Sequence, residues 1–339
     1  MGLYCGIDIS SKFCSICIID ENRQVVKECT VATDGESLRE ALHGLQDLTC
    51  VVEASPLAEW ICEQVEIDNH KIHILCPRQA KAVTATLKKT DKRDAKNLAE
   101  VCKTGWYTKV HRKSDDARAM RSFATARKQL VDTCAGLSAS IRGILRAHGI
   151  KLPTQQAGST DFYNAVKNVL PQLPKILQKA LKEMLKNWKS THDSQRKLYR
   201  EIQKLAAKSP EAQLLMTVPG VGPLIATVFL ATLDDHKRFS GEDKVGSYLG
   251  LTPSVYQSGE TEYYGRITKQ GDGLLRWLLV EGANVLLTRT KQDFALKEWG
   301  LRLQREKGPA KARVAVARKL GCLLYRTWKT GEPFKYELA

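Results

Sequence analysis

Four acidic residues lie at positions where a carboxylate is unusual without a charged partner or a bound cation. Asp8 lies inside the apolar run LYCGIDIS, and Glu53 follows two valines in TCVVEAS. Asp91 and Asp94 are three residues apart in KKTDKRDAKNLAE, a spacing that puts both on one face of a helix. A charge in a buried strand is costly unless it is paired or bound to a metal. The set predicts a carboxylate cluster that binds cations.

Each acid taken alone has a simpler interpretation. Asp8 could be a buried acid that is hydrogen-bonded to backbone, although Asp is disfavoured in strands. Glu53 could cap the following helix, and Asp91 could be the N-cap of its own helix. Asp91 and Asp94 could also be solvated residues of a mixed-charge surface. Only the four acids together, in this order along the chain, favour a shared site.

The elements that must position these acids follow from hydrophobic periodicity. Short apolar runs predict strands, and apolar residues at helical spacing predict helices between them. A hairpin-ordered group of strands followed by alternating helices and strands indicates a mixed sheet with helices packed on it. The predicted order is strands at 3–10, 12–20 and 24–32, a helix at 35–47, a strand at 49–55, a helix at 57–68 and a strand at 71–77.

An Asp on the first strand, an acid at the end of the fourth strand and acids on a later helix form the arrangement of the ribonuclease-H-like fold. In that fold two divalent metals, roughly 3.5–4 Å apart, activate a nucleophile and stabilise the leaving oxygen of a phosphoryl transfer. Ligands that are all carboxylates suit Mg²⁺. Two Mg²⁺ ions, which Mn²⁺ could replace, are therefore the expected cofactors.

The rest of the chain is predicted to be mainly helical. A helix over 92–105 is followed by a long helical run from Asp115 or Asp116 to about His148, and a second helical region spans 161–207. These two basic segments predict a helical hairpin or coiled coil that promotes oligomerisation. In LLMTVPGVGPLIATVFLATL, Gly220 and Gly222 predict a helix-hairpin-helix, whose second helix could offer its N-terminus to a phosphate. The predicted domains are 1–110, 111–208 and 209–339.

The chain of 339 residues carries a formal net charge of +16, with a pI near 9.4. Residues 1–76 hold 5 Lys or Arg against 13 Asp or Glu, whereas residues 77–150 hold 17 against 6. Such a basic protein favours nucleic acid or another anionic surface as its partner. The ten cysteines are scattered, and Cys14 and Cys17 lack a second CxxC pair, which argues against a zinc site. Without a long apolar run, we expect no membrane partner, reduced thiols and a cytoplasmic protein.

The stretches GIDIS, VVEASP and KTDKRDAKNLA resemble the DEDD transposases of the bridge-RNA-guided insertion-sequence family. The first domain of that family resembles the RuvC junction resolvase, and the pilin-gene DNA invertases belong to the same group. VPGVGPLIATVFLATL, YLGLTP and QSGETEYYGRITKQGDGLLRWLLVEGA resemble the family's second characteristic region. The resemblance covers nearly the whole chain and is least specific over about 150–205.

The resemblance implies an α/β fold joined to an α fold, namely a RuvC-like sheet domain, a helical linker and a mainly helical C-terminal domain. It implies a recombinase whose four acids bind Mg²⁺ and whose Ser258 attacks DNA and becomes covalently joined to it. A structured bridge RNA would pair with donor and target DNA, and the protein would act as a homodimer or homotetramer near a bacterial or archaeal nucleoid. Taken alone, Ser258-Gly259 is an ordinary turn. Because Ser258 and the acids fall in different predicted domains, the site could be completed between protomers.

Basic and aromatic residues near these positions are further candidates for nucleic-acid binding. A solvated surface is the simpler interpretation of the lysines, and ordinary packing is the simpler interpretation of Tyr256, Tyr263 and Tyr264, which could otherwise stack on unpaired bases. The predicted phosphate contacts are Lys88, Lys89, Lys92 and Arg93 beside the helix acids, and Arg266, Lys269 and Arg276 beside Ser258.

Other functions remain open on the sequence alone. A structure-selective, Mg²⁺-dependent nuclease or junction resolvase would use the four acids with water, and a site-specific invertase would need no guide RNA. A binding protein without catalysis would use only the basic helices and the helix-hairpin-helix. Ser258→Ala separates the recombinase from the nuclease, and Asp8→Ala separates both enzymes from the binding protein.

Overall fold

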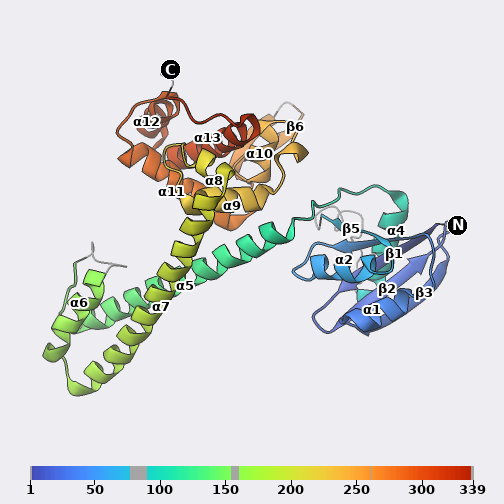
Figure 1. Ribbon diagram of the computed structural model, residues 1–339, viewed down its shortest axis with the longest axis horizontal. Coiled ribbons are helices and arrows are strands. Elements are labelled where there is room, and N and C mark those ends of the chain that lie inside the picture. The colour runs from blue at the N-terminus through green and yellow to red at the C-terminus, as the bar shows by residue number, and fades with distance from the viewer. Residues whose placement is uncertain (1, 77–89, 154–159, 260, 337–339) are drawn as a thin grey trace. The chain divides into compact units, whose positions relative to one another are not determined.

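The computed structural model describes residues 2–76, 90–153, 160–259 and 261–336 (Figure 1). The chain forms two compact units, Met1–Lys113 and Ser114–Ala339. Each unit contains buried hydrophobic clusters of its own. The finer division into 1–110, 111–208 and 209–339 stays a prediction.

A five-stranded mixed sheet forms the centre of the first unit, in the order β3-β2-β1-β4-β5. β1 (Leu3–Ile9) pairs antiparallel with β2 (Phe13–Ile19), and β2 pairs antiparallel with β3 (Val25–Ala32). On its other side β1 pairs in parallel with β4 (Leu48–Glu53), which pairs in parallel with β5 (Lys71–Leu75). The predicted mixed sheet is confirmed, and its name as a ribonuclease-H-like fold stays a prediction.

Helices cover both faces of this sheet. α1 (Gly35–Leu42) and α2 (Ala58–Glu66) pack on one face, against Ile7 of β1 and Val52 of β4. α4 (Asp91–Thr104) packs on the other face, against Val51 of β4. Successive side chains of a strand point to opposite faces, so Gly6 and Asp8 lie on the α4 face of the sheet.

The first helix is shorter than the predicted range 35–47. α1 ends at Leu42 because His43 leaves the helical backbone, with φ −57° and ψ 140°. Gly44 then adopts a left-handed conformation with φ of +76°, which glycine accepts at little cost. Leu45 nevertheless packs on the core that α1 covers, as its apolar character predicts.

Long helices begin the second unit (Figure 1). α5 (Asp115–Ala147) packs along α7 (Lys175–Lys208), and α6 (Thr160–Val169) covers one end of the pair. Trp188 of α7 is buried there and donates its indole N–H to Ser138 Oγ of α5 at 2.8 Å. The predicted helical region 161–207 is not one helix, since a 3-10 turn at Leu170–Gln172 separates α6 from α7. A coiled coil stays a prediction.

The remaining elements of the second unit enclose one large core, and most of them are helices. Across the described residues no helix has the length and apolar character needed to cross a bilayer. The elements are α8 (Pro210–Leu215), α9 (Pro223–Leu233), a 3-10 turn at His236–Arg238, α10 (Glu242–Tyr248), β6 (Pro253–Ser258), β7 (Thr261–Ile267), α11 (Gly273–Arg289), α12 (Ala295–Lys307) and α13 (Pro309–Thr330).

Candidate acidic site and serine-bearing hairpin

Asp8 and Glu53 lie next to each other at the carboxyl edge of the sheet. The parallel register of β1 and β4 runs from Leu3 opposite Leu48 to Ile7 opposite Val52. One residue further, the same register brings Asp8 beside Glu53. Both side chains are half-buried and lie on the α4 face of the sheet, because they alternate with the residues beneath α1 and α2.

Gly6 allows α4 to lie directly on β1. A Cβ atom at this position would come within 2.0 Å of the Ala95 carbonyl oxygen and 2.4 Å of the Ala99 amide nitrogen. Both distances are far below normal contact, so only glycine permits the observed approach of helix to strand. Gly6 therefore fixes the depth at which the first turn of α4 meets the sheet.

The direction of α4 brings its two acids to the same edge of the sheet. Ala95, near the start of the helix, lies over Gly6, whereas Cys102, near its end, donates its thiol to the carbonyl of Thr49, near the start of β4. The helix therefore runs opposite to the parallel strands, and its first turn lies over their carboxyl ends. Asp91 and Asp94 occupy that turn, one helical turn before the buried Ala95 and Leu98.

Three elements thus place four carboxylates at one edge of the first unit. Among the described residues, however, no group of three or more His, Cys, Asp or Glu side chains is close enough to hold a metal ion. Carboxylates that share a site repel each other in their charged forms. The donor set, which is carboxylate oxygen throughout, fits Mg²⁺ or Mn²⁺ chemically, but the side chains do not form a finished cage.

The local structure also gives Asp91 and Asp94 a stabilising role. Thr90 is the N-cap of α4, and its Oγ1 accepts the Arg93 amide at 3.4 Å. Acids in the first turn of a helix interact favourably with the N-terminal end of its dipole. Asp91 is exposed and Asp94 is half-buried. Asp8 and Asp94 each also have a polar or electrostatic interaction with another group.

The basic residues predicted beside these acids fall into two groups. Lys88 and Lys89 lie outside the described residues. Lys92 and Arg93 are exposed on the first turn of α4, where Lys92 forms an ion pair with Glu28 of β3 at 3.4 Å. An exposed pair of this kind contributes little to stability, and contact of Lys92 and Arg93 with a phosphate stays a prediction.

Ser258 lies in the second unit, on a two-stranded ribbon formed by β6 and β7. It is exposed and pairs with Thr261 at the end of the ribbon, beside Gly259 with φ of +57°. The root of the ribbon is fixed to the core by close backbone contacts. A Cβ on Gly250 would come within 1.9 Å of the Gln270 carbonyl oxygen, and one on Gly271 within 2.0 Å of the Tyr248 carbonyl oxygen.

Arg266 and Lys269, the predicted phosphate contacts near Ser258, are exposed along β7 and just after it. Arg276 has a different environment. It is half-buried, and its guanidinium donates to the Leu249 carbonyl at 3.3 Å, at the C-terminal end of α10. The structure thus gives Arg276 a local role in joining α11 to α10.

Gly220 and Gly222 lie in the turn between α8 and α9. Gly220 has φ of +83°, and its Cβ would come within 2.4 Å of the Gly282 carbonyl of α11, so glycine is required there for both backbone and packing. Gly222 is the N-cap residue of α9, which is almost entirely buried. Both glycines are therefore explained by the local backbone and packing, and their contact with nucleic acid stays a prediction.

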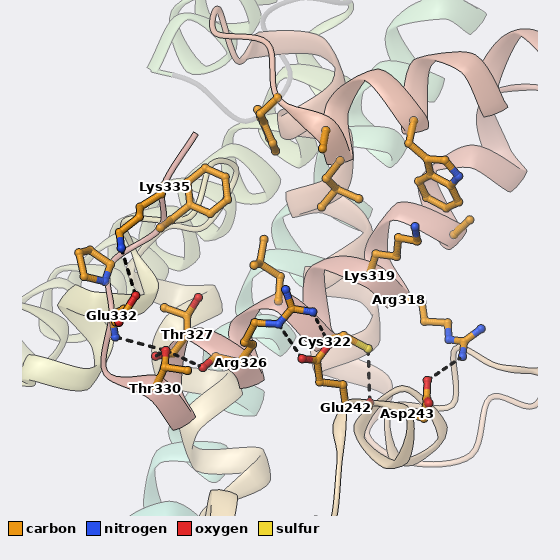
Figure 2. A pocket seen from close by; sticks show the side chains of 18 residues that line it. Glu242, Asp243, Arg318, Lys319, Cys322, Arg326, Thr327, Thr330, Glu332 and Lys335 are labelled. Atoms are coloured by element: carbon orange, nitrogen blue, oxygen red, sulfur yellow. Dashed lines mark hydrogen bonds and ion pairs between the residues drawn. The ribbon is translucent and has the colours of Figure 1, made fainter. Parts of the chain in front are cut away.

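A groove of about 730 Å³, which the sequence does not reveal, lies between α10, α12, α13 and the C-terminal segment (Figure 2). Its cations already have partners. Arg326 makes two hydrogen bonds to the carboxylate of Glu242, at 2.6 and 2.9 Å, and the Lys319 ammonium lies 4.0 Å from the ring centre of Trp299. These pairs join the walls of the groove, and they satisfy cations that could otherwise bind an anion.

All ten cysteines are free thiols, and most are buried. Burial raises the pKa of Cys62 and of Cys102 to about 12, and a hydrogen bond with Cys50 together with burial raises the pKa of Cys5 well above its usual value. Thiols with such pKa values stay protonated at neutral pH and react slowly. The buried cysteines therefore belong to the core, and the expectation of reduced thiols fits them.

The chain is similar over most of its length to transposases. Residues 5–150 match the family model of the DEDD transposase of IS110, and residues 212–297 match the model described as "Transposase IS116/IS110/IS902 family". The transposase for insertion sequence element IS1111A of Coxiella burnetii is 26% identical over 97% of this chain and 90% of its own length. A "Probable family 20 transposase" of Pseudomonas aeruginosa is 25% identical over 94% of this chain and 95% of its own length.

These matches define the class of protein as a transposase, a DNA-processing enzyme. The chain belongs to the IS116/IS110/IS902 family of insertion-sequence transposases. The DEDD model spans Asp8, Glu53, Asp91 and Asp94, and the second model spans Ser258. Neither model covers 151–211 or 298–339, which include α7, most of α12 and all of α13.

Proposed function

We propose that this transposase is an RNA-guided recombinase whose four acids bind two Mg²⁺ ions and whose Ser258 forms a covalent bond to DNA. One observation carries the acidic half of the proposal: β1, β4 and α4 bring Asp8, Glu53, Asp91 and Asp94 to the same edge of the sheet. Exposure at the end of the ribbon supports the nucleophilic role of Ser258. We also propose that the first unit has a ribonuclease-H-like fold and that Mn²⁺ can replace Mg²⁺.

The protein's own groups have separate tasks in this reaction. The four carboxylates hold the metal ions, which stabilise charge on the phosphate when they are bound. Ser258 Oγ attacks phosphorus and loses its proton to a base. A bond from serine oxygen to phosphorus forms as one bond from phosphorus to a DNA oxygen breaks, and that departing oxygen takes up a proton to become a hydroxyl. Lys92, Arg93, Arg266 and Lys269 contact the DNA backbone.

Two substitutions test the chemistry. Asp8→Asn keeps the size of the side chain but removes its charge, and we expect strand cleavage to fall by about 10²-fold or more. Asp68→Asn, at an exposed position of the same unit, is the matched control and should keep wild-type activity. Cleavage of labelled DNA across a Mg²⁺ and Mn²⁺ titration is the measurement. Unchanged cleavage in Asp8→Asn would contradict the acidic site.

Ser258→Ala tests the nucleophile. We expect this variant to form no covalent protein–DNA adduct, measured on denaturing gels after protease and nuclease controls, while its DNA binding stays near wild type. If metal-dependent cleavage persists in Ser258→Ala, water is the nucleophile and the protein is a nuclease or resolvase. If both Asp8→Asn and Ser258→Ala keep full biological function, the protein acts by binding alone.

RNA guidance is tested with transcripts of the DNA that flanks the gene. We expect recombination between donor and target duplexes to require one such RNA, and changes in its pairing loops to redirect insertion to matching targets. Product junctions are read by sequencing. Recombination that proceeds without any RNA would instead favour an invertase-like enzyme. Crosslinking and sedimentation of the active complex test the proposed homodimer or homotetramer.

A further inference from the structure

The ribbon of β6 and β7 exposes three tyrosine side chains, Tyr256, Tyr263 and Tyr264. The two strands form a sheet of their own, and nearly all of their described side chains are exposed. Tyr256 and Tyr263 are 57% and 56% exposed, although the sequence predicts ordinary packing for them. A two-stranded ribbon is only marginally stable in water by itself, so this surface favours a binding partner.

The two tyrosine rings stack on each other and form one aromatic platform. Tyr256 pairs with Tyr263 across the ribbon, and their ring centres are 4.9 Å apart with planes only 10° from parallel. Aromatic pairs that stack in this way are stabilised beyond the area they bury. The stacked pair is thus formed before any ligand binds, and the outer face of a ring is available for further stacking.

The platform and Ser258 lie on the same face of the ribbon. Directly opposed residues of an antiparallel pair share a face, and so do residues two apart on one strand. Ser258 is two residues after Tyr256 and pairs with Thr261, which is two residues before Tyr263. Tyr264 pairs with Val255 and therefore lies on the opposite face.

The chemistry of this face suits a nucleobase. Its residues in the described part of the ribbon tip are two tyrosines, a serine and a threonine, and none of these carries a charge. Glu262, the acidic residue of β7, lies on the opposite face with Tyr264, whose hydroxyl donates to it at 2.8 Å. Exposed Arg266 and Lys269 near the root supply positive charge for a phosphate backbone.

We propose that Tyr256 and Tyr263 bind an unpaired DNA base next to the phosphate that Ser258 attacks. At about 3.4 Å of rise per residue, Tyr256 and Ser258 are roughly 7 Å apart along β6, so a base on the platform belongs to a nucleotide close to the reacting phosphate. Stacking of this kind tolerates different bases, because every base has a π face. The platform thus positions the strand without reading its sequence. This inference rests on the proposed role of Ser258.

The test uses full-length Ser258→Ala protein, in which binding is measured without reaction. The probe is a short single-stranded DNA with 2-aminopurine at alternate positions. The comparison strand has the same sequence with abasic sites at those positions. We expect 2-aminopurine fluorescence to be quenched on binding, and the abasic strand to bind about tenfold to a hundredfold more weakly. With Tyr256→Ala and Tyr263→Ala added, the two strands should bind equally.

Matched variants separate stacking from folding of the ribbon. The Phe substitutions Tyr256→Phe and Tyr263→Phe keep both rings and should behave as the parent protein. Tyr264→Ala removes an even more exposed ring from the opposite face and should also leave the abasic penalty unchanged. An abasic penalty that stays the same in the double Ala variant overturns the platform. A change of oligomeric state in that variant, measured by sedimentation, assigns the surface to protein contacts and also overturns it.

The outcomes distinguish this inference from the proposed function. If wild-type protein forms no serine–DNA adduct but the tyrosine-dependent abasic penalty persists, the nucleophile is wrong; base stacking by the tyrosines then stands, and its place beside a reacting phosphate falls. If the adduct forms in wild type while the penalty does not depend on the tyrosines, the nucleophile stands and the platform is wrong.

Discussion

Gly6 shows how one residue without a side chain positions charged groups elsewhere. Its lack of a Cβ lets the α4 backbone approach β1 closely, and Ala95 lies only one residue after Asp94. A shift of the helix at Gly6 would therefore move both helix acids relative to Asp8. The geometry of the proposed site depends on this contact as much as on the acids themselves.

Gly6→Ala is expected to destabilise the first unit by roughly 2–3 kcal/mol, because backbone atoms at 2.0 and 2.4 Å cannot rotate away as a side chain would. The matched control is Gly136→Ala in α5, where a Cβ would meet no atom within 4 Å. That change should stabilise its helix by about 0.5–1 kcal/mol. Urea unfolding followed by circular dichroism measures both, and equal effects would contradict the packing argument.

The neighbouring element β5 contains a histidine whose protonation opposes folding. His73 is half-buried, and its Nε2 lies 2.9 Å from the ammonium nitrogen of Lys109. Burial, followed by the charges of Lys109 and Lys71, lowers the pKa of His73 below its usual value of 6.5. The folded state therefore favours the neutral ring, which accepts a hydrogen bond from Lys109.

The stability of the first unit should accordingly fall as the pH drops through about 6.5, because the unfolded chain then binds a proton that folded His73 resists. His73→Gln removes this contribution, so its loss of stability between pH 7.5 and pH 5.5 should be smaller than in wild type. Urea midpoints at the two pH values measure the difference. The exposed control His43→Gln should follow wild type, and an identical pH response of His73→Gln and wild type would refute the assignment.

On the scale of the whole molecule, the net charge belongs to one unit. Residues 1–113 hold 16 Lys or Arg and 16 Asp or Glu, so the first unit is neutral. Residues 114–339 hold 37 against 21 and carry the entire net charge of +16. Nonspecific attraction to a polyanion should therefore come mainly from the second unit.

Because each unit has its own buried clusters, we expect fragments 1–113 and 114–339 to fold separately, with cooperative thermal transitions. Fragment 114–339 should bind duplex DNA with an affinity that falls steeply as salt increases, and fragment 1–113 should bind at least about tenfold more weakly at low salt. Fluorescence anisotropy over a salt series measures this. Equal binding by the two folded fragments would contradict the charge argument.

The sequence by itself determined the elements and the acids. Strand alternation around Ile7 and Val52, helical spacing at 92–105 and 115–148, and the unusual positions of Asp8 and Glu53 all depend on residues close together in the chain. For that reason the mixed sheet was predictable, as were the two long helices and the transposase resemblance. Ser258 was recognisable only by that resemblance, since a Ser-Gly pair alone indicates no more than a turn.

Only the tertiary structure decided where these elements meet. The direction of α4 over β1, the capping contact of Arg276 and the exposed stack of Tyr256 on Tyr263 each join residues whose contact no local pattern encodes. Exposure of the tyrosines in particular runs against their apolar character, because the ribbon leaves the core at a root fixed by backbone contacts. Burial is a property of the packed chain, and packing depends on residues that are distant in sequence.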